Sequence, residues 1–185
     1  MGVYAILGIA TVLVVIAVLI AWFISIYNRF FSLRNSAEST LGQIRVAMKK
    51  RLDMIDQLLG AVKSYAAFER DTMEKITHMR SAVGSASAKD MRDLDDEAKS
   101  ILGRVYAVAE SYPDLKTSTV VKDLTNSIAE LENEIARQRY TYNNIAQEYN
   151  TMRETIPSNI VGGLLNLSKM DYLELGELNV PEVRF

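Results

Sequence analysis

The sequence contains no cysteine, one histidine and three prolines in 185 residues. The absence of cysteine excludes disulfides, thiol catalysis and zinc–thiolate sites. The prolines stand at positions 113, 157 and 181, so no obligatory helix breaker occurs before residue 113. The chain also lacks a charge excess, because 21 basic residues face 23 acidic ones. Proteins that bind nucleic acid present a basic face, so this balance gives no reason to expect nucleic acid as a partner.

Charged side chains are missing altogether from the first 28 residues. A spanning helix needs about 20 mainly apolar residues to cross roughly 30 Å of hydrocarbon, and the apolar run is long enough for this. Tyr4 near one end, and Trp22 and Tyr27 near the other, stand where aromatic residues contact the membrane interface. Arg29 follows as the first charge. We therefore predict one transmembrane helix and contact with a lipid bilayer.

Two other interpretations of the apolar run are weaker. A cleaved signal peptide has a basic start, a shorter apolar stretch and a small-x-small cleavage site. Here no Lys or Arg precedes the run, and Ala21 is followed by Trp22 and Phe23. A buried core helix is the second alternative, but a core helix of this length would need a polar face toward solvent. No second run of comparable length occurs, which indicates a single-pass protein.

Basic residues predict the orientation of the protein in the cell membrane. Two uncharged residues precede the span, whereas Arg29 and Arg34 follow it closely. The positive-inside rule then places the N-terminus outside and the large domain in the cytoplasm.

The rest of the chain shows helical periodicity and no convincing strand. Apolar residues recur at steps of three and four from Leu41 to Val83, and no proline interrupts the chain from Val3 to Val83. The span can therefore be continuous with the first long helix. We predict an all-α protein, an N-terminal transmembrane helix followed by an antiparallel helical bundle. The predicted ranges are a tail at 1–2, the span at 3–27, a bundle at 28–170 with helices at about 29–83, 91–112, 117–156 and 158–169, and a loosely ordered tail at 171–185.

Three polar residues stand at positions where the apolar patterns expect an apolar side chain: Arg51, Glu69 and Gln138. Such residues commonly extend a polar head group to solvent or lie on the rim of a bundle, and we expect this. The alternative is a buried polar set that fixes the helix register at some cost in stability. We name the three residues as candidates for register or interaction.

A catalytic, cofactor or metal site cannot be assembled from the sequence. His78 is the only histidine and lacks partners, and Gly162-Gly163 has neither a preceding strand nor a phosphate-loop lysine. The acidic run Asp93, Asp95, Asp96 and Glu97 lacks the ligand spacing of a calcium loop, so we expect a solvated helix face. We expect neither enzymatic activity nor a cofactor.

Several short motifs occur together in one order along the chain. They are Tyr27-Asn28, Leu33-Arg34-Asn35, Gln43-Ile44-x-Val46, Lys50-Arg51-x-Asp53-x-Ile55, Val62-Lys63-x-Tyr65, Glu69, Tyr112-Pro113-Asp114-Leu115-Lys116, Glu132-Asn133-x-Ile135-Ala136, Arg139, Tyr142-Asn143, Tyr149-Asn150 and Pro157-Ser158-Asn159. In this combination the chain resembles the LemA family of bacterial and archaeal membrane-anchored helical proteins over roughly residues 1–165. The family's tryptophan near Leu41, proline near Asp56 and histidine near Phe68 are absent, and the last twenty residues lack the usual family ending.

The resemblance implies a short outer tail, one span and a cytoplasmic helical bundle, with no established enzyme activity. Some relatives are associated with building magnetosome membranes, which makes membrane organisation a role by analogy. Our first hypothesis is a membrane-anchored scaffold that forms a homo-oligomer and organises membrane or membrane-protein assemblies. The alternative is an adaptor that binds another membrane protein, such as a protease or sensor kinase, through the tail at 171–185.

Overall fold

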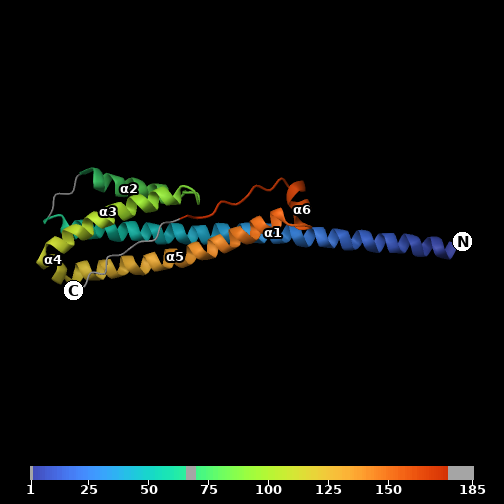
Figure 1. Cartoon of the computed structure of the whole chain (residues 1–185), viewed down its shortest axis with the longest axis horizontal. Coiled ribbons are helices and arrows are strands. Elements are labelled where there is room, and N and C mark those ends of the chain that lie inside the picture. The colour runs from blue at the N-terminus through green and yellow to red at the C-terminus, as the bar shows by residue number, and fades with distance from the viewer. Residues whose placement is uncertain (1, 66–69, 175–185) are drawn as a thin grey trace. The chain divides into compact units, whose positions relative to one another are not determined.

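The computed structural model describes residues 2–65 and 70–174, and every regular element in those ranges is helical. The prediction of an all-α protein is confirmed. The described residues form two compact units, unit 1 (2–38 and 145–170) and unit 2 (39–65, 70–144 and 171–174). The helices are α1 (Gly2–Val62), α2 (Arg70–Val83), α3 (Met91–Ser111), α4 (Pro113–Thr117), α5 (Thr119–Glu154) and α6 (Ser158–Leu164) (Figure 1).

In unit 2, α1 buries the apolar stripe that the sequence predicted. Leu41, Ile44 and Met48 begin the stripe, and Ile55 and Leu58 continue it; each is at most 5 % exposed. Residues spaced by three and four fall on one face of a helix with 3.6 residues per turn. This face forms the core together with buried residues of α2, α3 and α5.

A chain reversal separates α1 from α2, where the sequence predicted one helix over 29–83. Arg80 of α2 forms salt bridges with Asp53 (2.7 Å) and Asp56 (3.2 Å) of α1. Asp56 precedes Arg80 by 24 residues, which in one straight helix would place them about 36 Å apart. The prediction of a single helix is therefore wrong in its second half. No proline marks the reversal, and Glu69, the polar residue in register nearest to it, lies outside the described residues.

A capping box closes the turn between α2 and α3. The Ser87 amide and hydroxyl donate to the Asp90 carboxylate (3.2 and 2.6 Å), and the Asp90 amide donates to the Ser87 hydroxyl (3.3 Å). These hydrogen bonds lower the pKa of Asp90. Arg45 of α1 donates two hydrogen bonds to the Ala86 carbonyl (3.0 and 2.9 Å), so the turn is tied to α1. Figure 1 shows α2 lying alongside α3.

The helices predicted at 91–112 and 117–156 correspond to α3 and α5, and the five-residue α4 lies between them. Apolar residues that recur every seven positions on α5 pack inside the same chain: Val121, Ile128 and Ile135 are each at most 6 % exposed. These three residues therefore belong to the core of unit 2.

In unit 1, the end of the apolar segment packs on the end of α5 and on α6. Phe30 and Leu33 of α1, Tyr149 of α5 and Val161 of α6 form the buried centre. The Phe30 and Tyr149 rings meet edge to face, with centroids 5.4 Å apart. We call these four residues, with the half-buried side chains around them, the unit 1 cluster.

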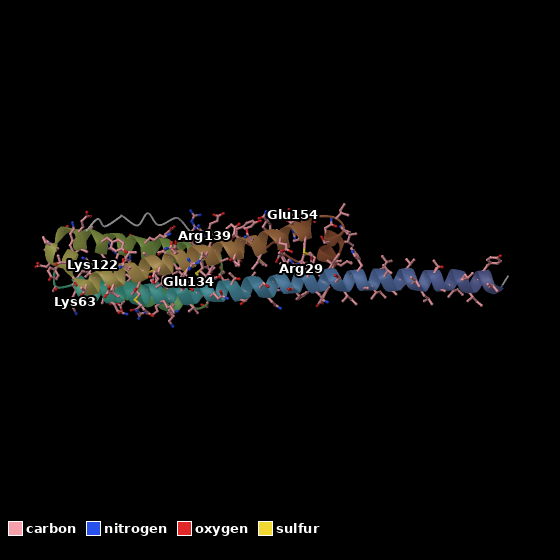
Figure 2. All side chains as sticks on the ribbon, turned by 90° about the horizontal axis from the view of Figure 1, so that it is seen from below. Arg29, Lys63, Lys122, Glu134, Arg139 and Glu154 are labelled. Carbon is pink, nitrogen blue, oxygen red and sulfur yellow. The ribbon has the colours of Figure 1, made fainter. Side chains whose placement is uncertain are left out.

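The first part of α1 has no such cover. Within the described residues, α1 is the one helix long and apolar enough to cross a membrane, and its most apolar 18-residue window is not buried at all. Figure 2 shows these side chains projecting from α1 with no described helix around them. Because a core helix would be buried, the core-helix alternative is wrong.

Candidate functional site: a buried ion network and two amide clamps

A network of ion pairs lies in the core of unit 2. Arg51 of α1 is 1 % exposed and donates hydrogen bonds to Asp95 of α3 (2.7 Å) and to Glu132 of α5. The Lys99 ammonium lies 2.7 Å from the second carboxylate oxygen of Asp95. Two cations thus face two carboxylates, and the network is neutral. Since an unpaired buried charge costs several kcal/mol, pairing is what allows these side chains inside the core.

The network corrects two expectations from the sequence. Arg51 does not extend its head group to solvent, and Asp95 is not part of a solvated face, because each is 1 % exposed. A signal for Asp95 is present in the sequence, since it shares one face of α3 with apolar residues that are all buried: Met91, Ala98, Leu102 and Val105. An acidic residue on such a face requires a cationic partner, and Arg51 was the cation already found out of place.

The role that this network can perform is structural: it holds three helices together. Its three innermost members come from three different helices, so the hydrogen bonds of Arg51 to Asp95 and Glu132 form at one axial register of those helices. Tyr106 of α3 is buried nearby, and its hydroxyl has no hydrogen-bond partner among the described residues. Burial and the charge of Glu132 raise the pKa of Tyr106 to about 12. A substrate could not reach Arg51 or Asp95 without separating the helices.

Two asparagines of α5 hold the non-helical segment (167–174) that follows α6. In unit 1, the Asn150 amide donates to the Met170 carbonyl and accepts from the Met170 amide, both at 2.9 Å. In unit 2, Asn143 makes the same pair of hydrogen bonds with Leu173, at 3.1 and 2.8 Å. An asparagine side chain carries one acceptor and one donor group, so it pairs with a backbone as a neighbouring strand would. We call these pairs the amide clamps.

Further contacts hold the same segment. The Arg153 side chain donates to the Leu167 carbonyl (2.7 Å), and the Tyr142 hydroxyl donates to the Asp171 carbonyl (3.2 Å). The expectation of a loosely ordered tail is therefore wrong for residues 171–174, while 175–185 lie outside the described residues. Sequence periodicity could not reveal these contacts, because one partner in each is a backbone group.

The motifs Tyr142-Asn143 and Tyr149-Asn150, which hold the segment, lie within a longer match to a protein family. The model of the LemA family matches residues 40–185. The chain belongs to the LemA family. The match begins after the apolar segment and reaches the last residue, so the expectation that the final twenty residues depart from the family is wrong.

Named relatives share moderate identity with this LemA-family chain. Protein LemA of Metamycoplasma hominis is 27 % identical over 158 residues, which cover 84 % of this chain and 72 % of that protein. Magnetosome protein MamQ 2 of Paramagnetospirillum magneticum is 23 % identical over 195 residues, covering 91 % of this chain and 71 % of that protein. Magnetosome protein MamQ of Magnetospirillum gryphiswaldense is 20 % identical, covering 79 % of this chain and 64 % of that protein.

Several other motif residues of the LemA pattern lie at exposed or half-buried positions. Tyr112 is 40 % exposed with its ring 5.4 Å from that of Tyr65, and Pro113 begins α4. Lys116 and Arg139 are half-buried, as is the register candidate Gln138. The exposed motif residues include Asn28, Arg34, Asn35 and Asp114. Of the three register candidates, Arg51 alone is found in the ion network; Gln138 is not part of it, and Glu69 is not described.

The residues assigned to the membrane interface all lie in unit 1. Tyr4 is 83 % exposed, and Tyr27 stacks on Phe31 with ring centroids 4.5 Å apart. Trp22 packs on the unit 1 cluster, and Arg29 forms a salt bridge with Glu148 of α5. The two ends of the apolar segment therefore differ in the contacts of their aromatic side chains. Tyr4 is exposed, whereas Trp22 and Tyr27 pack against other residues of unit 1.

A shallow groove of about 500 Å³ lies between α1 and α5 in unit 2. Met54 and Leu131 contribute apolar surface to it, and Lys50, Glu134 and Arg137 contribute charges of both signs. Within the described residues, no three His, Cys, Asp or Glu side chains are grouped as a metal site would require.

Proposed function

We propose that this LemA-family protein is a single-pass membrane protein whose helical bundle self-associates and organises membrane or membrane-protein assemblies, without enzymatic activity. One observation carries the proposal. Trp22, Phe23 and Ile26, at the end of the apolar segment, pack on the same cluster as α5 and α6. A signal peptide is removed, which would expose that cluster, whereas a permanent anchor completes it.

The orientation is part of the proposal. Arg29 and Arg34 follow the apolar segment, so the N-terminus lies outside and the bundle in the cytoplasm. Protease treatment of intact spheroplasts tests this placement. A C-terminal epitope should survive until the membrane is permeabilised, and its loss from intact cells would reverse the orientation.

The internal chemistry favours a scaffold over an enzyme. The ion network is buried and neutral, and it links three helices, as expected of a network that fixes their register. An anchor also confines copies to the plane of the membrane, which raises their effective concentration for self-association. Two of the relatives are named as magnetosome proteins, which supports a role in membrane organisation by analogy.

Self-association is tested on the full-length protein in mild detergent and in lipid nanodiscs. Because Val121, Ile128 and Ile135 of α5 are buried within the chain, self-association must use other surfaces, including the apolar segment. Mass photometry and crosslinking across a concentration series should show species larger than the 20.8 kDa chain. A monomer at every concentration, in both environments, would refute the scaffold.

The groove of unit 2 favours a second function, an adaptor for another membrane protein. Met54 and Leu131 present apolar surface beside charges of both signs, a surface suited to a helix from a partner protein. Leu131→Glu should then abolish capture of the partner while leaving the oligomeric state unchanged. If the substitution alters the oligomeric state instead, the groove belongs to the self-association surface.

A further inference from the structure

The turn and helix after α5 form a long uncharged stretch. From Thr155 to Ser168 there are fourteen residues without Asp, Glu, Lys, Arg or His, the longest such run after residue 28. The run contains α6 and is bounded by Glu154 and Lys169. A surface helix of a water-soluble bundle normally carries charges on its outer face, and α6 carries none.

The outer face of α6 is apolar instead. Ile160 and Leu164 lie one turn apart on this helix and are 56 % and 72 % exposed, and Ile156, just before it, is 83 % exposed. The opposite face is packed, since Val161 is fully buried in the unit 1 cluster and Gly162 is also buried. The helix is thus docked by one side and presents aliphatic side chains on the other.

The unit 1 cluster places this face beside the end of the apolar segment. Trp22, Phe23 and Ile26 of α1 pack on the same cluster as Val161. These three residues precede Arg29, the first charge of the chain, by three to seven positions, or about 4.5–10.5 Å along the helix axis. The docking site of α6 is therefore on the last two turns of the span, at the depth of a membrane interface.

Polar contacts join the two ends of this stretch, which we call its base, whereas α6 and Ile156, its tip, carry no charge. Lys169 forms a salt bridge with Glu154 at 3.6 Å, and Arg153 donates to the Leu167 carbonyl at 2.7 Å. Figure 1 shows α6 next to α1, beyond the end of α5, and Figure 2 labels Glu154 at that end. Charge at the base and aliphatic side chains at the tip are the arrangement of an interfacial membrane anchor.

We infer that α6 is a second membrane contact, in which Ile156, Ile160 and Leu164 insert into the boundary between headgroups and acyl chains beside the span. The inference rests on the proposed membrane anchoring. Such a contact would fix the rotation of the span about its axis, because α6 is attached to one face of α1. It would also add apolar volume to one leaflet, which is how shallow insertions act on membrane curvature.

The test uses the absence of cysteine, which allows a single label on the full-length protein. Ile160→Cys, Leu13→Cys in the span and Val120→Cys, a 57 % exposed position of unit 2, are labelled with an environment-sensitive fluorophore in phosphatidylcholine–phosphatidylglycerol vesicles. We expect blue-shifted emission at the first two positions, and quenching at Ile160 that is strongest with nitroxide lipids labelled near the headgroup. The label at Val120 should show the red-shifted emission of a fluorophore in water.

Other labelling results would refute either the membrane contact of α6 or the membrane anchoring of α1. A water-exposed label at Ile160 with a lipid-embedded label at Leu13 would refute the inference and leave the anchor intact. A label at Ile160 that becomes protected only after a membrane protein extract is added would also refute it, because the occupant would be protein. A water-exposed label at Leu13 would refute the membrane anchoring itself.

A charge variant supplies an independent test. Leu164→Asp places a carboxylate at the tip without touching the packed face, so it should return the Ile160 label to water. Val120→Asp is the matched control and should leave the Ile160 label in lipid. If both variants leave the Ile160 emission unchanged, the exposed face of α6 does not insert.

Discussion

Arg51→Met is the substitution that most directly tests the buried ion network. It replaces the guanidinium with an apolar side chain and leaves Asp95, which is 1 % exposed, with Lys99 as its remaining partner. Breaking a buried pair by removing one member costs about 3–5 kcal/mol, because the other charge remains in the core. Lys99 compensates in part, so we expect a loss near the lower end of that range. Against a typical total of about 5–15 kcal/mol, this is a large effect.

Hydrogen exchange measured by mass spectrometry is the appropriate assay, because the two units need not unfold together. A loss of about 3 kcal/mol should speed exchange in α3 peptides on the order of 100-fold, since about 1.4 kcal/mol corresponds to a factor of ten. Arg92→Met is the matched control. Its salt bridges with Asp96 and Glu174 are exposed, and exposed pairs contribute about 0–1 kcal/mol.

A third variant separates the loss of charge pairing from the loss of packing. Arg51→Met combined with Asp95→Asn and Glu132→Gln removes the stranded charges, so it should exchange more slowly than Arg51→Met alone. The reasoning would be refuted if Arg51→Met changed exchange in α3 by less than about threefold, or if Arg92→Met had an equal effect.

Three further predictions concern other contacts. Asn143→Ala removes one amide clamp and should speed proteolysis of the non-helical segment, with a local cost of about 1–3 kcal/mol, whereas Asn144→Ala, at the exposed neighbouring position, should not. Gly162→Leu should weaken docking of α6 by about 1–3 kcal/mol, because a Cβ added at this glycine would lie 3.4 Å from the packed Phe30 ring. Gly163→Leu should not, because a Cβ there would meet nothing within 4 Å; exchange of the α6 peptide measures both. The raised pKa of Tyr106 favours its neutral form in the fold, so stability falls as the pH rises from 10 through about 12, and Tyr106→Phe should remove that loss in alkaline unfolding curves.

The helical class and the faces of the long helices could be predicted because they follow from periodicity. Leu41, Ile44 and Met48 on α1 are buried as their spacing indicates. The reversal before α2 could not be predicted in the same way. The apolar register resumes in α2 after the turn with nearly the same phase, and no proline interrupts it, so one helix and a helical hairpin produce the same pattern.

The sequence indicated one member of the ion network but not its partners. Arg51 stood out as a charge on an apolar face, but its partners are residues of α3 and α5, and contacts between helices have no fixed sequence spacing. Asp95 was hidden among acidic neighbours that are solvated, although its own position on α3 belongs to the buried face. The amide clamps gave no signal beyond the motif itself, because Asn143 binds backbone groups of a segment without periodicity.

The attachment of α5 and α6 to the end of the apolar segment has a consequence for biosynthesis. Arg29 and Glu148 are partners separated by 119 residues. Under the proposed anchoring, the apolar segment therefore enters the membrane before its partners in α5 and α6 are translated. Under the same proposal, the unit 1 cluster can form only once α6 has been translated, around a helix that is already inserted. A stop codon after α5 would leave a correctly targeted chain with Phe30 uncovered, a substrate that membrane-bound quality-control proteases could recognise.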